Sequence, residues 1–124
     1  MAIRITALSG ALDQTASTFG SYVVTIPNNE VCEIEMPLSA GHVLISSLST
    51  QVHGLLWCRG SALIKYFSGT ALDAVNTALT GTTGADGKTT CGVNANIFYI
   101  ENRSGVENKI TVTFLGCGKV TMGN

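Results

Sequence analysis

Charge is the scarcest feature of this 124-residue sequence, because only 12% of its residues are charged, about half the usual share of roughly 25%. The seven basic residues are scattered singly and the net charge is −1, so no basic stripe can follow a phosphate backbone. No run reaches the roughly 18 consecutive apolar residues that a membrane-spanning helix needs. We therefore expect neither nucleic acid nor a membrane among the partners of this chain.

Paired cysteines are also lacking, since Cys32, Cys58, Cys91 and Cys117 form no C-x-x-C motif of a zinc ribbon or thioredoxin type. Each cysteine stands in or beside an apolar run, as in LLWC and FLGC. The N-terminal sequence MAIRITALSG lacks the basic-then-apolar layout of a secretory signal, which predicts folding in a reducing cytoplasm. Buried, reduced thiols are the preferred interpretation, with disulfides and metal ligation as the alternatives.

Motifs for catalysis are incomplete. GTTGADGKT, Gly81–Thr89, approaches a phosphate-binding loop, but its glycine spacing is one residue too long and poor helix formers follow it. His42 and His53 fall inside predicted strands, and no G-x-S-x-G elbow is present. Glu33 and Glu35 are two residues apart on a predicted strand, where a wet face explains them better than glycoside hydrolysis does. We expect no enzyme activity, no catalytic residue, no cofactor and no metal.

The residues that are abundant favour sheets and tight turns, since the chain contains 15 Thr, 10 Ser and 14 Gly. Apolar residues recur with a period of two along most of the chain, which predicts an all-β sandwich or barrel. Residues 71–80 fit either a helix or a strand, and we prefer a strand or irregular structure. The expected strands span residues 2–8, 21–26, 31–36, 42–48, 52–58, 62–67, 93–100 and 109–115, with a short tail strand at 119–122.

Turn signals connect several of these strands. PNNE at residues 27–30 and Asp86-Gly87 are tight-turn sequences. The polar linker ENRSGVENK predicts that residues 93–100 and 109–115 form a hairpin, with Val112 on its core face. In residues 31–36 the alternation predicts one buried face and one wet face that carries the two glutamates.

The stretch Tyr99–Gly105, YIENRSG, followed by Ile110–Phe114, ITVTF, resembles the closing hairpin of small jelly-roll sandwiches in tailed-bacteriophage virions. The loop GTTGADGKTT is similar to glycine- and threonine-rich loops of phage decoration and fibre proteins. The resemblance spans residues 81–116. It implies a jelly-roll-like, single-domain antiparallel β-sandwich of about 8 to 10 strands over residues 1–124, and we expect residues 1–20 to supply a strand or arm that engages neighbours.

For function, the resemblance implies a non-enzymatic virion protein, most concretely a capsid decoration (cement) protein that binds and stabilises the shell. Such a protein is made in the host cytoplasm and carried on the virion. The implied partners are the major capsid protein or another virion protein, and further copies of this chain, with a homotrimer favoured. The residues that we expect at the interface are Asn102, Arg103, Ser104, Asp86, Lys88 and Phe19.

The alternative is a carbohydrate- or receptor-binding sandwich of a phage tail fibre or spike, or of a similar surface apparatus. It requires exposed aromatic side chains, and Trp57 and Tyr99 are the residues expected to stack on a glycan. Trp57 and Tyr66 lie in the apolar runs LLWC and IKYF, which favours a place in the core or at a subunit interface. Exposure of these aromatic rings therefore separates the two hypotheses.

Overall fold

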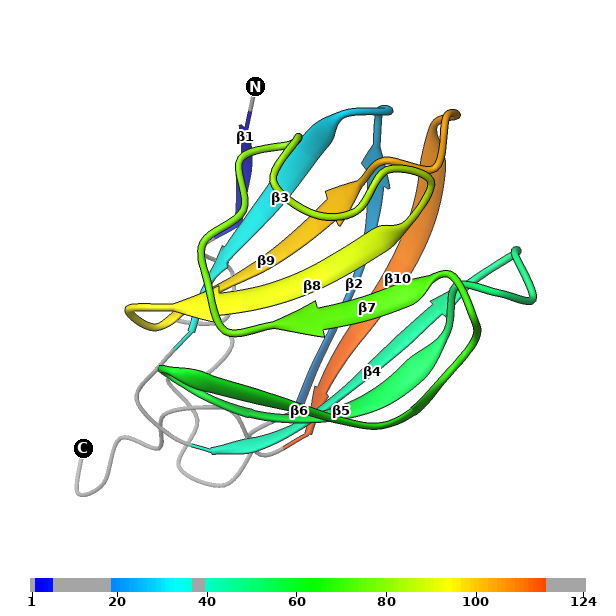
Figure 1. Cartoon of the computed structure of the whole chain (residues 1–124). Helices are drawn as coiled ribbons and strands as arrows, with labels where there is room; N and C mark the ends of the chain where they lie inside the picture. The colour runs from blue at the N-terminus through cyan, green and yellow to red at the C-terminus, as the bar shows by residue number, and fades with distance from the viewer. Residues whose placement is uncertain (1, 6–18, 37–39, 116–124) are drawn as a thin grey trace, which may run out of the picture.

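Two packed β-sheets make up the computed structural model, which describes residues 2–5, 19–36 and 40–115 (Figure 1). The strands are β1 (Ala2–Ile5), β2 (Phe19–Ile26), β3 (Glu30–Glu35), β4 (Gly41–Ser47), β5 (Gly54–Arg59), β6 (Ala62–Ser68), β7 (Leu72–Val75), β8 (Thr89–Asn94), β9 (Ile97–Asn102) and β10 (Asn108–Leu115). The predicted all-β sandwich is confirmed. The described residues contain no helix long and apolar enough to cross a membrane.

Each sheet has five strands. Sheet A has the order β1-β3-β9-β8-β7, and sheet B has the order β2-β10-β4-β5-β6. Most neighbours are antiparallel, but β1 pairs with β3 and β7 pairs with β8 in parallel. Strands β4, β5 and β6 form a meander within sheet B, whereas the chain changes sheet after β1, β2, β3, β6 and β9. Successive strands therefore often lie on opposite sides of the core.

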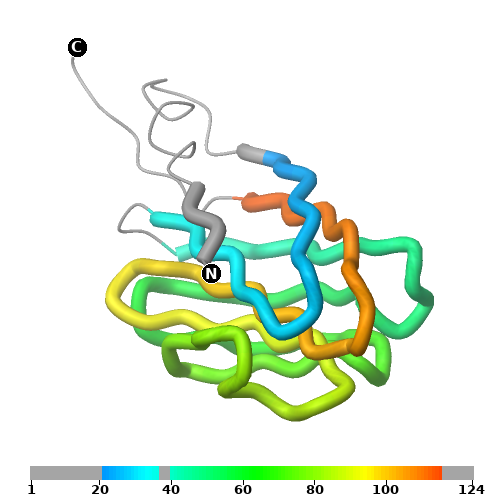
Figure 2. Tube along the Cα trace, turned by 90° about the horizontal axis from the view of Figure 1, so that it is seen from above, coloured from blue at the N-terminus to red at the C-terminus, as the bar shows by residue number. Residues whose placement is uncertain are grey.

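The turn predicted at residues 27–30 makes one of these changes of sheet. Figure 2 shows β2 turning into β3 here, with Asn29 in the left-handed region at φ 61°. The Glu30 amide donates to the Pro27 carbonyl oxygen at 3.3 Å, and the Asn29 amide donates to the carbonyl oxygen of Asn102 at 2.6 Å. An asparagine tolerates this conformation better than most residues, so the sequence signal and the geometry agree.

The predicted hairpin between residues 93–100 and 109–115 is wrong. Strand β8 ends at Asn94 and β9 begins at Ile97, and the intervening Ala95 and Asn96 have φ of 50° and 66°. Positive φ at both central residues is the geometry of a two-residue hairpin loop, so the true hairpin is β8–β9. Strand β10 lies in sheet B between β2 and β4. The linker between β9 and β10 therefore passes from sheet A to sheet B, and the two strands face the same core from opposite sides.

The core fills the space between the sheets. Phe98 of sheet A and Phe114 of sheet B meet edge to face with ring centroids 5.6 Å apart. The alternation predicted for residues 31–36 is confirmed, since Cys32, Ile34 and Met36 are buried while Glu33 is half-buried and Glu35 exposed. Each large apolar side chain buried here contributes roughly 1.5–3 kcal/mol relative to exposure.

A strap formed by residues 76–79 covers part of the outer face of sheet A. It follows β7, which occupies only the first part of the ambiguous stretch 71–80 (Figure 1). Leu79 of the strap forms a small buried cluster with Val31 and Tyr99. A Cβ atom at Gly92 would lie 2.5 Å from the Thr77 carbonyl oxygen, so this glycine lets the strap approach the sheet.

Three predictions fall partly or wholly outside the described residues. They are the tail strand at 119–122, the state of Cys117, and most of the N-terminal arm at residues 1–20. Within the arm, residues 2–5 form β1 and pair in parallel with β3.

Candidate functional site

The predicted interface residues near Asn102 lie in a polar network at one end of the sandwich. We call this network the polar crown and define it as residues 81–88, residues 101–105 and Asn29. At its centre is the Glu101 side chain, which is fully buried. Its carboxylate accepts hydrogen bonds from the backbone N–H groups of Gly81, Thr83 and Gly84, at 2.8, 3.0 and 2.7 Å.

The Gly-rich loop therefore does cradle an anion, but the anion is a carboxylate of the same chain. Gly81 adopts φ 113°, and a Cβ atom there would lie 2.6 Å from the Asn29 carbonyl oxygen. Only glycine fits both restraints. From the sequence, a phosphate-binding loop was rejected here and Glu101 was not singled out. The available signal was a lone acidic residue at the end of the apolar run IFYI.

Arg103 fastens the same loop from outside. Its Nη1 donates to the Gly84 carbonyl oxygen at 2.7 Å, and its Nε donates to Asn29 Oδ1 at 3.3 Å. Its Nη2 lies 3.6 Å from Asp86 Oδ1, a pair in which the Asp86 side chain is 88% exposed. Because most donors of Arg103 are engaged within the chain, little of its hydrogen-bonding capacity is left for a partner.

Asn102 and Ser104 are likewise engaged internally. Asn102 is fully buried, and its Nδ2 donates to the carbonyl oxygens of Ile26 and Val106 at 2.8 and 2.7 Å. Its Oδ1 accepts from the Ser104 backbone N–H at 3.0 Å and from Ser104 Oγ at 2.7 Å. These contacts tie the end of β9 in sheet A to the end of β2 in sheet B and to the linker that leads into β10.

Of the other two predicted interface residues, Lys88 belongs to the crown through its backbone, because its carbonyl oxygen accepts from the Arg103 N–H at 2.9 Å, but its side chain makes its contacts outside the crown. Lys88 Nζ donates to the Thr70 carbonyl oxygen at 3.0 Å and lies 3.6 Å from Asp73 Oδ1. Phe19 begins β2 and pairs with Leu115 of β10. The structure thus brings Asp86, Asn102, Arg103 and Ser104 together, but as a stabilising network.

The cysteines that the structure describes are buried and form no disulfide, as preferred from the sequence. They are Cys32, Cys58 and Cys91. Burial raises the pKa of the Cys32 thiol to about 11, with the nearby Glu33 charge as a second cause, and raises that of Cys91 to about 12. Both thiols stay protonated and unreactive near neutral pH. Within the described ranges, no three acidic, histidine or cysteine side chains are grouped to hold a metal ion.

The residues considered for acid–base chemistry are separated by the fold. Glu33 and Glu35 lie on β3 of sheet A, with side chains on the outer side of that sheet. His42 lies on β4 of sheet B, exposed on the opposite outer face, and His53 precedes β5. The two glutamates and His42 therefore lie on opposite outer faces of the sandwich.

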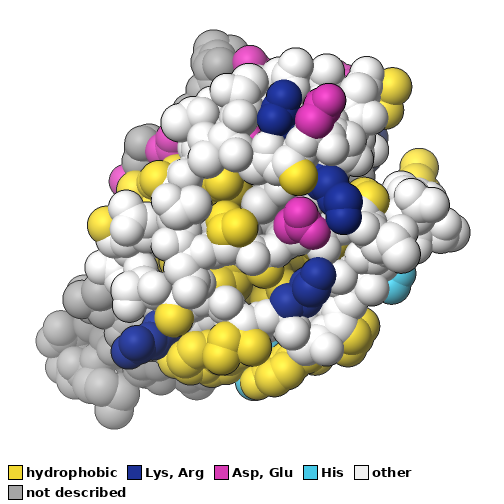
Figure 3. All heavy atoms as spheres, in the orientation of Figure 1, with side chains coloured by type: hydrophobic (Ala, Val, Ile, Leu, Met, Phe, Trp, Pro, Cys, Tyr) yellow, Lys and Arg dark blue, Asp and Glu magenta, His cyan; other side chains and the backbone are white. Residues whose placement is uncertain are grey.

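The outer face of sheet B is the exposed apolar surface of the molecule. Two rows of paired residues cross it: His42, Trp57 and Ile64 form one, and Leu44, Leu55 and Phe67 form the other. We define the apolar face as these two rows together with Tyr66, which stacks on His42 with ring centroids 5.7 Å apart. Ile64, Tyr66 and Phe67 are 53, 56 and 55% exposed. Figure 3 shows hydrophobic side chains along the lower margin, where β5 and β6 lie.

Of the two residues predicted to stack on a glycan, only Trp57 lies on the apolar face. Trp57 is half-buried on this face, beside the exposed Tyr66. Tyr99 is only 7% exposed and lies in the cluster with Leu79 of the strap, so the prediction that it stacks on a ligand is wrong. Sequence reasoning missed this because the strap is not a strand and its path across sheet A has no local signature.

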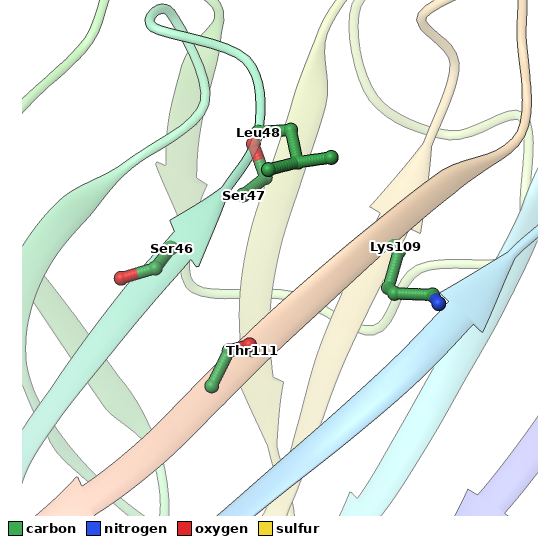
Figure 4. Close-up of a pocket in the computed structure, with 5 residues that line it drawn as sticks. All are labelled: Ser46, Ser47, Leu48, Lys109 and Thr111. Atoms are coloured by element: carbon green, nitrogen blue, oxygen red, sulfur yellow. The ribbon is translucent and has the colours of Figure 1, made fainter.

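A shallow hollow of about 280 Å³ lies next to the apolar face, between β4 and β10 (Figure 4). Ser46 and Thr111 are register partners on its floor, and Leu48 and Lys109 stand at its end. Leu48 is 99% exposed. The hollow is lined by hydroxyl groups, one amine and one exposed leucine. A shallow lining of this kind is better suited to contact with another protein than to binding a small molecule, which usually occupies a deep pocket.

Comparisons of the chain with protein-family models, curated proteins and solved structures found no match. The structural feature that bears on function is the contrast between the satisfied polar crown and the exposed apolar face.

Proposed function

We propose that this chain is a non-enzymatic structural subunit that docks through the apolar face of sheet B onto a protein shell. The resemblance of YIENRSG and ITVTF to tailed-phage virion proteins makes a capsid decoration protein the concrete form of the proposal. Its partner would be the major capsid protein, and its place the virion.

The observation that carries the proposal is the gathering of exposed large apolar side chains on one sheet. Ile64, Tyr66 and Phe67 on β6 are each more than half exposed, and Leu44 is 37% exposed. Contiguous apolar patches of this kind mark interaction sites on soluble proteins. The outer face of sheet A has its own cover, because the strap buries Val31 and Tyr99. Within the described residues, part of the outer face of sheet A is therefore covered, whereas the outer face of sheet B is exposed.

Docking energy follows from burial of these side chains. Removing an isoleucine or phenylalanine side chain from water contributes roughly 1.5–3 kcal/mol, and a standard interface buries about 800 Å² on each partner. Repetition on a shell lattice adds avidity when several copies are linked, so no single contact has to be strong. The low charge of the chain, 12% of residues, agrees with a surface that is partly covered in the assembled state.

The test is co-sedimentation of the purified full chain with empty shells assembled from the major capsid protein of the same phage. We expect saturable binding that Ile64→Lys weakens at least about tenfold, since a charge replaces a buried apolar contact. Val106→Lys is the matched control, because Val106 is 64% exposed on the β9–β10 linker, away from the apolar face.

Two outcomes would contradict the proposal: a wild-type chain that stays in the supernatant, or an Ile64→Lys variant that binds as tightly as wild type. Unfolding curves of both variants show whether any loss of binding reflects loss of the fold.

A second candidate function, carbohydrate binding, is favoured by one feature of the same face. Tyr66 is 56% exposed and stacks on His42, with Trp57 as the register partner of His42. Exposed aromatic rings of this kind provide apolar platforms with a polar edge. Retention of the wild-type chain on a polysaccharide column, lost in Tyr66→Ala but kept in Val106→Lys, together with no binding to shells, would support this function instead.

A further inference from the structure

Four strands lie at sheet edges, and their free sides differ in how they are protected. Sheet A ends in β1 and β7, and sheet B ends in β2 and β6. An edge strand presents unpaired backbone N–H and C=O groups, so it can accept a further strand unless charge, shortness or a covering segment prevents it. Each edge of this molecule can be examined for those devices.

Three of the edges carry such devices. Strand β1 has four residues and contains Arg4, and β7 has four residues with Asp73 paired to Lys88. Strand β6 is longer but has a register irregularity opposite Leu55 and Leu56. Its Leu63 N–H donates to Asn76 Oδ1 at 2.8 Å, so a side chain occupies part of its free side.

Among the described residues, strand β2 has none of these devices. It runs for eight residues, Phe19–Ile26, with no charged residue and no proline. All eight residues pair in unbroken register with β10 on one side, and no described strand lies on the other. Near its middle, Val23 is 62% exposed. A long, regular, uncharged edge with an exposed β-branched side chain is the kind that pairs with another strand.

We infer that β2 is a self-association edge, at which β2 of a second copy of this chain pairs antiparallel to it. An antiparallel pair of identical strands satisfies a two-fold axis, so each residue of one copy finds its counterpart in the other. The absence of charge on β2 means that no like charges meet across that axis. This inference goes beyond the shell-docking proposal and does not depend on what the apolar face binds.

The geometry favours a second copy over an unrelated strand. Two-fold pairing at β2 would join two copies of sheet B into one continuous sheet, because β2 is the last strand of that sheet. The apolar faces of both copies would then lie on the same side and form one larger surface. The two Val23 side chains would lie close together near the axis and shield each other from water.

The oligomeric state of the full chain tests this inference. Light scattering coupled to size-exclusion chromatography over a dilution series should show a monomer–dimer equilibrium. Val23→Lys should raise the dimer dissociation constant at least about tenfold, because it removes apolar contact and places two like charges near the axis. Val106→Lys is the matched control, since that side chain is 64% exposed and remote from β2. It should leave the equilibrium unchanged.

Amide hydrogen exchange identifies the edge independently. Raising the protein concentration should slow exchange in peptides that cover β2 and leave peptides that cover β6 unchanged. A wild-type monomer throughout the dilution series would overturn the inference. So would an oligomer, dimeric or trimeric, that Val23→Lys leaves intact. Loss of shell binding in Ile64→Lys with an unchanged dimer would separate this edge from the docking face.

Discussion

The polar crown and the apolar face of sheet B differ in how completely their groups are satisfied. In the crown, Glu101 accepts three backbone N–H groups, and Arg103 donates to the Gly84 carbonyl oxygen. On the apolar face, Ile64, Tyr66 and Phe67 remain more than half exposed. The difference shows that the Gly-rich loop and the linker ENRSG, the most conspicuous polar motifs of the sequence, bond to each other within the fold. The exposed apolar surface comes instead from β4, β5 and β6, whose sequences carry no distinctive motif.

The largest effect is expected in the core beneath both regions. Val112 of β10 is fully buried, so Val112→Asp would place an unpaired carboxylate among apolar side chains. Such a change costs more than about 4 kcal/mol, comparable to the whole stability of a small domain. We expect no soluble folded protein, as judged by soluble yield and circular dichroism. Val106→Asp on the exposed linker is the control, and a native-like Val112→Asp protein would refute the core assignment.

The next largest effect is expected from breaking the crown at its centre. Glu101→Ala would leave the N–H groups of Gly81, Thr83 and Gly84 without their acceptor. Each unsatisfied group costs about 1–3 kcal/mol if the loop stays closed, so we expect a loss of about 3 kcal/mol in urea unfolding. Glu101→Gln retains the shape and one acceptor oxygen and should lose less. Equal losses in the two variants would show that hydrogen bonding is not the cause.

A smaller effect is expected at the periphery of the crown. Arg103→Ala removes the donor to the Gly84 carbonyl oxygen and should lower the free energy of unfolding by about 1 kcal/mol, leaving the fold intact. Asp86→Ala tests the ion pair alone, and because that side chain is 88% exposed we expect almost no change. Thermal denaturation of both variants measures the difference. Asp86→Ala destabilising as much as Arg103→Ala would contradict the assigned order.

The smallest effect on stability is expected on the apolar face. Ile64 is 53% exposed, so Ile64→Lys should change the free energy of unfolding by no more than about 0.5 kcal/mol in urea titration. The same variant should lose shell binding. This combination is the opposite of that expected for Arg103→Ala, which should lose stability and retain binding. If Ile64→Lys or Arg103→Ala lost both stability and shell binding, the separate roles assigned to the two regions would be wrong.

Local pattern was sufficient for most strands but not for their partners. The alternation in residues 31–36 correctly placed Cys32, Ile34 and Met36 in the core, because a period of two identifies one buried face. The same reasoning merged β8 and β9 into one strand, since Ala95 and Asn96 do not form a standard turn sequence. It also paired residues 93–100 with 109–115, because adjacent strands in the sequence are usually neighbours in a sheet.

The candidate site was less accessible from sequence than the fold. The linker ENRSG was predicted to supply interface residues, but its contacts within the chain were not predicted, because the partners of Glu101 and Arg103 lie some distance away along the chain, in residues 81–84. The apolar face is assembled from β4, β5 and β6, none of which differs locally from a core strand. Only the position of a strand in the sandwich decides whether its second face is covered.

By itself the sequence determined the class of fold. Its Thr-rich, period-two strands, the turns at residues 27–30 and 84–88, and the burial of three cysteines all follow from local propensity and the need to hide apolar side chains. Tertiary structure alone decided that the Gly-rich loop encloses Glu101, that the strap covers part of sheet A and that no described segment covers the outer face of sheet B. These outcomes depend on which strands pair across the chain, and local pattern carries no information about that choice.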